Sequence, residues 1–95
     1  MKVTFSALHF DASDRLQTFA TAEMQRLERY VGGHIDGDVV LKANGAVKVA
    51  EMRINALGRL LPVKVEGDDF YKIIPRGIEK LEKQLKSQKS KLYDR

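Results

Sequence analysis

The chain has 95 residues, which is enough for one small domain and too few for two. Hydrophobic residues make up 43% and charged residues 32%, the balance of a globular protein rather than a disordered one. The lack of cysteine excludes a disulfide framework, a zinc finger and thiol catalysis. No apolar run reaches the roughly 18 residues of a membrane span, and the N-terminus lacks the apolar core of a signal peptide. We therefore expect a cytoplasmic protein that engages no membrane.

Positive charge is concentrated towards the C-terminus. Of the net charge of +4, the segment from Lys72 to Arg95 carries +5, with eight basic and three acidic residues, and residues 1–71 carry −1. A basic stripe of this kind attracts polyanions such as nucleic acid, an anionic membrane or an acidic protein. The alternative is a solvated helix face rich in lysine, and charge alone does not choose between these two interpretations.

The N-terminal part of the chain predicts a strand followed by a helix. Residues 2–8 place Val3, Phe5 and Ala7 on one face, which is the period of a half-buried strand. Asp11 or Ser13 is expected to cap the helix that follows, and the glycine pair at 32–33 to end it. The apolar residues of this helix recur every three or four positions: Leu16, Phe19, Ala20, Met24, Leu27, Tyr30 and Val31.

The middle of the chain predicts two strands joined by a turn. Residues 39–41 are rich in β-branched side chains, and residues 49–56 alternate between apolar and polar positions. Asn44-Gly45 is a dipeptide favoured in two-residue hairpin turns, and it would place Val40 opposite Val49. A looser loop over residues 44–48 is the alternative, and the pattern leaves both open.

A fourth strand completes the predicted sheet. Leu61, Val63 and Val65 alternate, and Pro62, which has no N–H to donate, places this strand at an edge of the sheet. The element order is then β-α-β-β-β-α, with the first two strands parallel and the others antiparallel. The sequence predicts an α+β fold in two layers, a four-stranded mixed sheet with two helices on one face, in a single domain over residues 1–95.

The last element is a basic helix, expected at about residues 69–93. An aspartate at 68 or 69 caps it and complements its N-terminal dipole. Pro75 lies in its second turn and is expected to bend or interrupt it. The apolar stripe thins after Leu85, so the last two turns are expected to project beyond the core. The stripe consists of Phe70, Ile74, Ile78, Leu81, Leu85 and Leu92.

Residues suited to catalysis or metal binding are not grouped in the sequence. His9 and His34 lie far apart, and neither has a partner at the spacing of metal ligands. The sequence contains neither a phosphate-binding loop nor the Gly-x-Ser-x-Gly motif of serine hydrolases. We therefore expect a binding protein and not an enzyme, with no cofactor, no metal and no small-molecule substrate.

Four motifs follow one another along nearly the whole chain. They are Arg-Leu-Glu-Arg-Tyr at 26–30, Val-Val-Leu-Lys at 39–42, Glu-Gly-Asp-Asp-Phe-Tyr at 66–71 and Glu-Lys-Leu-Glu-Lys-Gln-Leu at 79–85, with a lysine-rich tail after them. In this order they resemble the ribosome hibernation factors, the family of hibernation-promoting factor and protein Y. Each motif alone is common in proteins, but four in sequence are specific. The length resembles the short class of that family.

The resemblance implies a function and a partner. It implies a domain, monomeric when free, that binds the small subunit of the 70S ribosome in the mRNA and tRNA channel, contacts 16S rRNA and idles ribosomes in stationary phase or stress. Glu23 stands where the family has a lysine, which weakens the first helix as an RNA contact. The expected RNA-binding residues are Arg26, Arg29, Lys42, Lys72, Arg76, Lys80, Lys83, Lys86, Lys89 and Lys91.

Two alternative functions stay open on the sequence alone. One is a generic module for structured RNA, and the other is a protein-interaction module that docks an acidic partner through its basic helix. No base-reading motif is present, so RNA would be recognised by shape and backbone. Tyr71 and Tyr93 are candidates for base stacking, although Tyr71 also suits the rim of the core.

Overall fold

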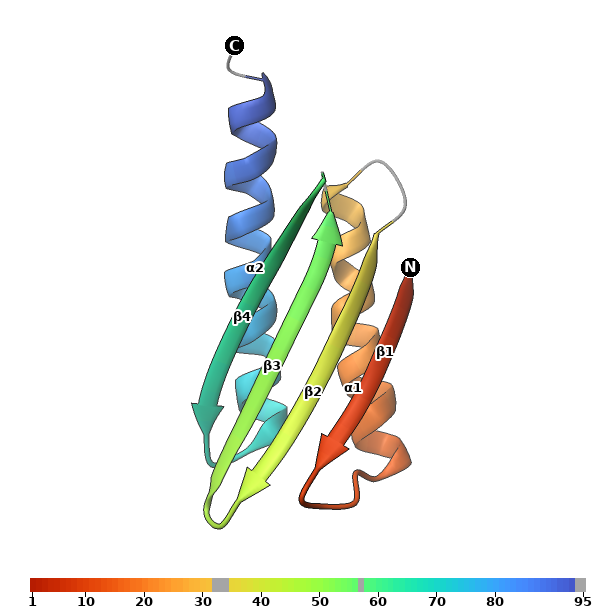
Figure 1. Cartoon of the computed structure of the whole chain (residues 1–95), viewed down its shortest axis with the longest axis vertical. Coiled ribbons are helices and arrows are strands. Elements are labelled where there is room, and N and C mark those ends of the chain that lie inside the picture. Colours follow the sequence, from red (N-terminus) through yellow and green to blue (C-terminus); the bar gives the residue numbers. More distant parts are fainter. Residues whose placement is uncertain (32–34, 57, 94–95) are drawn as a thin grey trace.

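The computed structural model describes residues 1–31, 35–56 and 58–93, with side chains up to residue 87. The elements in chain order are β1 (Lys2–Leu8), α1 (Asp14–Gln25), the 3₁₀ helix η1 (Arg26–Tyr30), β2 (Asp36–Asn44), β3 (Val47–Ala56), β4 (Arg59–Gly67) and α2 (Phe70–Tyr93) (Figure 1). This order confirms the predicted β-α-β-β-β-α succession.

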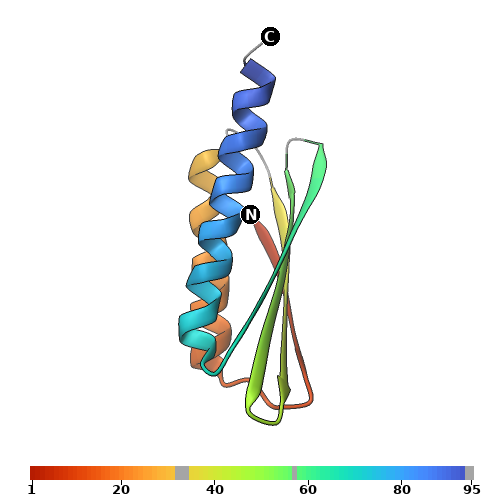
Figure 2. The same ribbon diagram turned by 90° about the vertical axis from the view of Figure 1, so that its left-hand side faces the viewer.

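The four strands form one mixed sheet in the order β1-β2-β3-β4. β1 and β2 are parallel, whereas β2–β3 and β3–β4 are antiparallel. α1 and α2 lie side by side on one face of the sheet and leave the other face open (Figure 2). β4, which contains Pro62, is an edge strand as predicted, so the missing N–H of the proline costs no pairing with an outer strand. The predicted α+β two-layer fold is confirmed.

The core lies between the covered face of the sheet and the apolar faces of the helices. In the sheet, buried side chains alternate with exposed ones, because successive residues of a strand point to opposite faces. The largest fully buried side chains are Met24, Leu27, Ile35, Val39, Leu41, Met52, Ile54, Ile73, Ile74, Ile78, Leu81 and Leu85. Burying each of these contributes about 1.5–3 kcal/mol, so this one layer dominates the stability of the fold.

The hairpin between β2 and β3 differs from both predicted forms. Gly45 and Ala46 form a two-residue loop, and Lys42 rather than Val40 lies opposite Val49. This register puts Leu41 opposite Ala50 on the covered face, whereas the predicted tight turn would have put Leu41 opposite Lys48. Gly45 has a φ of +63° at the first central position of the turn, where glycine is favoured in a type II′ turn.

The first helix begins as predicted but does not continue as a single α-helix. The Leu16 N–H donates to Ser13 Oγ at 3.1 Å, so Ser13 is the cap. The α-helix ends at Gln25 and tightens into the 3₁₀ helix η1, a common ending for an α-helix. Leu27 stays fully buried within this turn. The glycine pair that was expected to end the helix lies outside the described residues.

The second helix runs unbroken through Pro75, so of the predicted bend or interruption the structure excludes the interruption. The Tyr71 N–H donates to Asp69 Oδ1 at 2.9 Å, which confirms an aspartate cap. A proline so near the helix start removes the N–H that would bond to the Tyr71 carbonyl, and burial of Ile74 and Ile78 against the sheet offsets that loss. The C-terminal turns extend past the sheet, as predicted (Figure 1).

If packing keeps the helix continuous despite its proline, removing the proline should stabilise the fold. We expect Pro75→Ala to raise the free energy of unfolding by about 1–3 kcal/mol, because alanine restores the hydrogen bond and the helix propensity. Urea denaturation measures the change, with Arg76→Ala as a neighbouring exposed control. An unchanged or lower free energy of unfolding would show that the proline ring itself packs favourably.

Candidate nucleic-acid interface

Five expected RNA-binding residues lie on the solvent side of α2. Because the apolar residues of this helix recur every three or four positions and face the sheet, the cations between them are exposed. The five are Lys72, Arg76, Lys80, Lys83 and Lys86. From Lys72 to Lys86 the helix rises about 21 Å at about 1.5 Å per residue. Lys89 and Lys91 lie further along the same helix, where side chains are not described.

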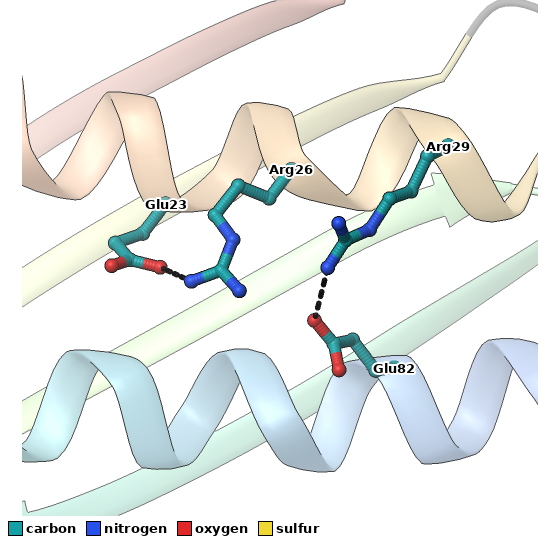
Figure 3. A network of polar contacts seen from close by, with 4 residues as sticks. All are labelled: Glu23, Arg26, Arg29 and Glu82. Atoms are coloured by element: carbon teal, nitrogen blue, oxygen red, sulfur yellow. Dashed lines mark hydrogen bonds and ion pairs between the residues drawn. The ribbon is translucent and has the colours of Figure 1, made fainter.

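Two more of the predicted residues, Arg26 and Arg29, reach the same face from the other helix. Arg26 Nη1 donates to Glu23 Oε2 at 2.8 Å, and Arg29 Nη2 lies 3.8 Å from Glu82 Oε1 on α2. Figure 3 shows both arginines between α1–η1 and α2 with their carboxylate partners. The structure therefore brings together cations that are distant in sequence, and we call their common surface the helical face.

The Glu23 carboxylate stabilises the charged form of Arg26. The hydrogen bond to Glu23 and the negative charge of that carboxylate raise the pKa of Arg26 above its usual value, with a smaller contribution from Glu82. Arginine is protonated at physiological pH in any case, so Glu23 holds Arg26 in an ion pair without changing its charge. Glu23 accepts a hydrogen bond from one of the cations of this helix, and its expected weakening of RNA contact stays a prediction.

Aromatic rings lie beneath the cations at two points of the helical face. Arg29 and Lys86 both approach the ring of Tyr30, at 5.2 and 5.3 Å from its centroid. Tyr71 packs on Phe19, with ring centroids 5.0 Å apart, and Arg15 lies 5.8 Å from the Tyr71 ring centroid. Tyr71 is thus an anchor between the helices that keeps 40% of its surface exposed. The side chain of Tyr93 lies outside the described part.

Lys42 is the one described site residue that the structure does not bring to the helical face. It lies on the open face of the sheet, where its Nζ is 3.2 Å from Glu51 Oε1. The other cations of this face also have acidic neighbours, since Arg53 pairs with Asp38 at 3.4 Å and Lys64 with Glu66 at 4.0 Å. Four basic and four acidic residues occupy the outward positions of the strands: Lys2, Asp36, Asp38, Lys42, Glu51, Arg53, Lys64 and Glu66.

The sequence analysis missed two residues of the helical face. It placed Tyr30 only among apolar core positions, and it did not foresee that Glu82 reaches Arg29 on the neighbouring helix. Both contacts join α1–η1 to α2, so no spacing within one element could have revealed them. The only available signal was that both residues fall within the motifs at 26–30 and 79–85.

Other kinds of site find little support in the described part of the chain. No three His, Cys, Asp or Glu side chains among the described residues are grouped so as to hold a metal ion. None of the helices, over the same residues, combines the length and apolar character needed to cross a membrane.

Comparison with known proteins identifies the family. Residues 3–93 match the family described as Sigma 54 modulation protein / S30EA ribosomal protein. The chain belongs to this family. Together with the relatives and solved structures described next, this match confirms the resemblance to the ribosome hibernation factors.

Relatives within the family match over nearly their full length. The protein from Escherichia coli K12 named ribosome hibernation promoting factor is 28% identical over 92 residues, covering 97% of each chain. The protein of the same name from Salmonella typhimurium is 27% identical over the same length.

Two solved structures have the same fold as this chain. The N-terminal domain of Thermus thermophilus protein Y is 28% identical, with a TM-score of 0.86 over 92% of this chain and 98% of that chain. A ribosomal subunit interface protein from Coxiella burnetii shares the fold, with a TM-score of 0.82, 21% identity, and coverage of 95% of this chain and 99% of that chain.

The exposed lysines of α2 should contribute little to the stability of the fold. Substituting them would then test binding without unfolding the protein. We expect the triple variant Lys72→Gln, Lys80→Gln, Lys83→Gln to change the free energy of unfolding by less than about 0.5 kcal/mol per substitution, because exposed side chains without structural roles change it that little. Urea denaturation of the variant and the parent chain measures this difference. A larger loss would mean that these lysines have a structural role.

Proposed function

We propose that the chain is a non-enzymatic, cytoplasmic regulator of translation that binds the small ribosomal subunit and idles ribosomes under stress. The observation that supports this most is the helical face, where two neighbouring helices present at least seven exposed cations. The names of the relatives, ribosome hibernation promoting factor and ribosomal subunit interface protein, agree with it. The finer proposal is that the helical face contacts 16S rRNA in the mRNA and tRNA channel.

The dimensions of the basic stripe suit a polyanion. At about 3.4 Å of duplex axis per phosphate of one strand, the 21 Å from Lys72 to Lys86 would span about six phosphates. The open face of the sheet, in contrast, carries equal numbers of positive and negative outward residues and offers no comparable attraction. Electrostatics therefore favours an approach of RNA from the helical side.

Recognition by this face would depend on the shape and backbone of the RNA. Lysine and arginine neutralise phosphates wherever the backbone presents them, and they carry no sequence information by themselves. Tyr71 packs on Phe19 as an anchor between the helices. A folded RNA channel that positions several phosphates at once would therefore be preferred over a single flexible strand. Lys42, on the open face, remains a predicted contact that requires RNA to reach both sides of the sheet.

Co-sedimentation with ribosomal particles tests the proposal. Purified chain is mixed with vacant small subunits, and the pellet is quantified across a salt series. The variant Lys72→Gln, Lys80→Gln, Lys83→Gln removes three cations of the helical face. The matched control Lys2→Gln, Arg53→Gln, Lys64→Gln removes three from the open face. Free duplex RNA serves as a competitor.

We expect saturable one-to-one pelleting with the small subunit. With about six phosphate contacts, the affinity should fall about 10³-fold between 50 and 200 mM salt. The helical variant should lose about three contacts and bind much more weakly, with a shallower salt dependence, while the control variant changes little. Equal competition by duplex RNA would favour a generic RNA module. No pelleting at 50 mM salt would refute ribosome binding and leave an acidic protein as the partner.

A further inference from the structure

Acidic side chains lie among the cations where α1 and η1 meet α2, although negative charge repels RNA phosphates. Three cations, Arg26, Arg29 and Lys86, lie there with two carboxylates, Glu23 and Glu82. We call these five residues the seam. With three positive and two negative charges the seam is nearly neutral, in contrast to the stripe along the rest of α2.

We propose that Glu23 and Glu82 act as internal counter-ions that compete with RNA phosphates for Arg26 and Arg29. In the free protein they occupy the guanidinium groups, and in the complex a phosphate must share or displace them. The two glutamates thus hold the affinity of the helical face below the value that its cations alone would give. This inference rests on the proposed function, since it concerns the same face and the same RNA.

The exposed fractions of the four side chains show that an RNA phosphate can reach the two arginines from the solvent. Glu23 and Glu82 have side chains that are only 15% and 17% exposed, so they lie low between the helices. The side chains of Arg26 and Arg29 are 52% and 59% exposed. The guanidinium groups are therefore open to a phosphate that approaches from the solvent, whereas the carboxylates are mostly buried.

The distances indicate that Glu82 holds its arginine loosely. Arg29 Nη2 is 3.8 Å from Glu82 Oε1, which is longer than a hydrogen bond, so the donors of Arg29 remain available to a second acceptor. Arg26, in contrast, makes a direct hydrogen bond of 2.8 Å to Glu23. Glu82 also adds to the negative potential at Arg26, and it lies one helical turn before Lys86. Neutralising Glu82 therefore acts on all three cations of the seam.

The other side of the sheet offers a matched control. Asp38 pairs with Arg53 at 3.4 Å on the open face, with side chains 44% and 51% exposed. Asp38→Asn changes the net charge by the same amount as Glu82→Gln and also releases an arginine. A difference in RNA affinity between these two variants would therefore come from the position of the removed charge, because both variants change the net charge equally.

The test is the binding of vacant small ribosomal subunits by the parent chain and by Glu82→Gln, Glu23→Gln and Asp38→Asn, measured by filter binding at 150 mM salt. We expect Glu82→Gln to bind about two- to fivefold more tightly, the range expected for an ion pair at the surface. Glu23→Gln should change affinity in the same direction, and Asp38→Asn should leave it nearly unchanged. Thermal unfolding confirms that each variant is folded.

A double-mutant cycle identifies the cation through which Glu82 acts. If Glu82 competes for Arg29, the gain from Glu82→Gln should shrink in an Arg29→Gln background, because the released guanidinium is absent. Weaker binding by Glu82→Gln would overturn the proposal, since Glu82 would then position Arg29 for RNA. So would equal effects of Glu82→Gln and Asp38→Asn, or a gain that is undiminished without Arg29. Failure of the parent chain to bind at 50 mM salt would instead refute the proposed function.

Discussion

Burial of only one face of the sheet is the constraint on which the rest of the structure depends. Two helices must cover the apolar side chains of β2, β3 and β4, so each helix turns its apolar stripe inwards. The rotation of α2 about its axis is fixed by Ile74, Ile78 and Leu81, all within the core. The cations between them have no place except the solvent side. The hydrophobic layer thus creates the helical face.

Much of this arrangement could be predicted from the sequence because it depends on local patterns. A helix cap at Asp11 or Ser13, the edge position of the strand with Pro62 and the exposed cations of α2 each follow from the properties of one element, and Ser13 is the cap. The hairpin register could not be predicted in this way, because packing of Leu41 against the helices outweighs the turn preference of Asn44-Gly45. The unbroken course of α2 through Pro75 likewise depends on tertiary packing. The Arg29–Glu82 contact joins two helices and has no signature in either one.

The two faces of the molecule differ in how their charges are balanced. On the open face of the sheet, cations such as Arg53 and Lys64 have acidic neighbours on the same strand or the next one. Along the part of α2 whose side chains are described the cations outnumber the acids, and at the seam Glu23 and Glu82 lie close to two arginines. If the helical face binds RNA as proposed, its own carboxylates would limit how tightly it binds.

The most direct test of the account is to find which face the small subunit covers. Lysine acetylation followed by mass spectrometry, with and without vacant small subunits, reports the accessibility of each lysine in the intact chain. The account predicts that Lys72, Lys83 and Lys86 lose reactivity in the complex, whereas Lys2 and Lys64 on the open face keep it. Protection of Lys2 and Lys64 with continued reactivity along α2 would contradict the central claim that the helical face binds the ribosome.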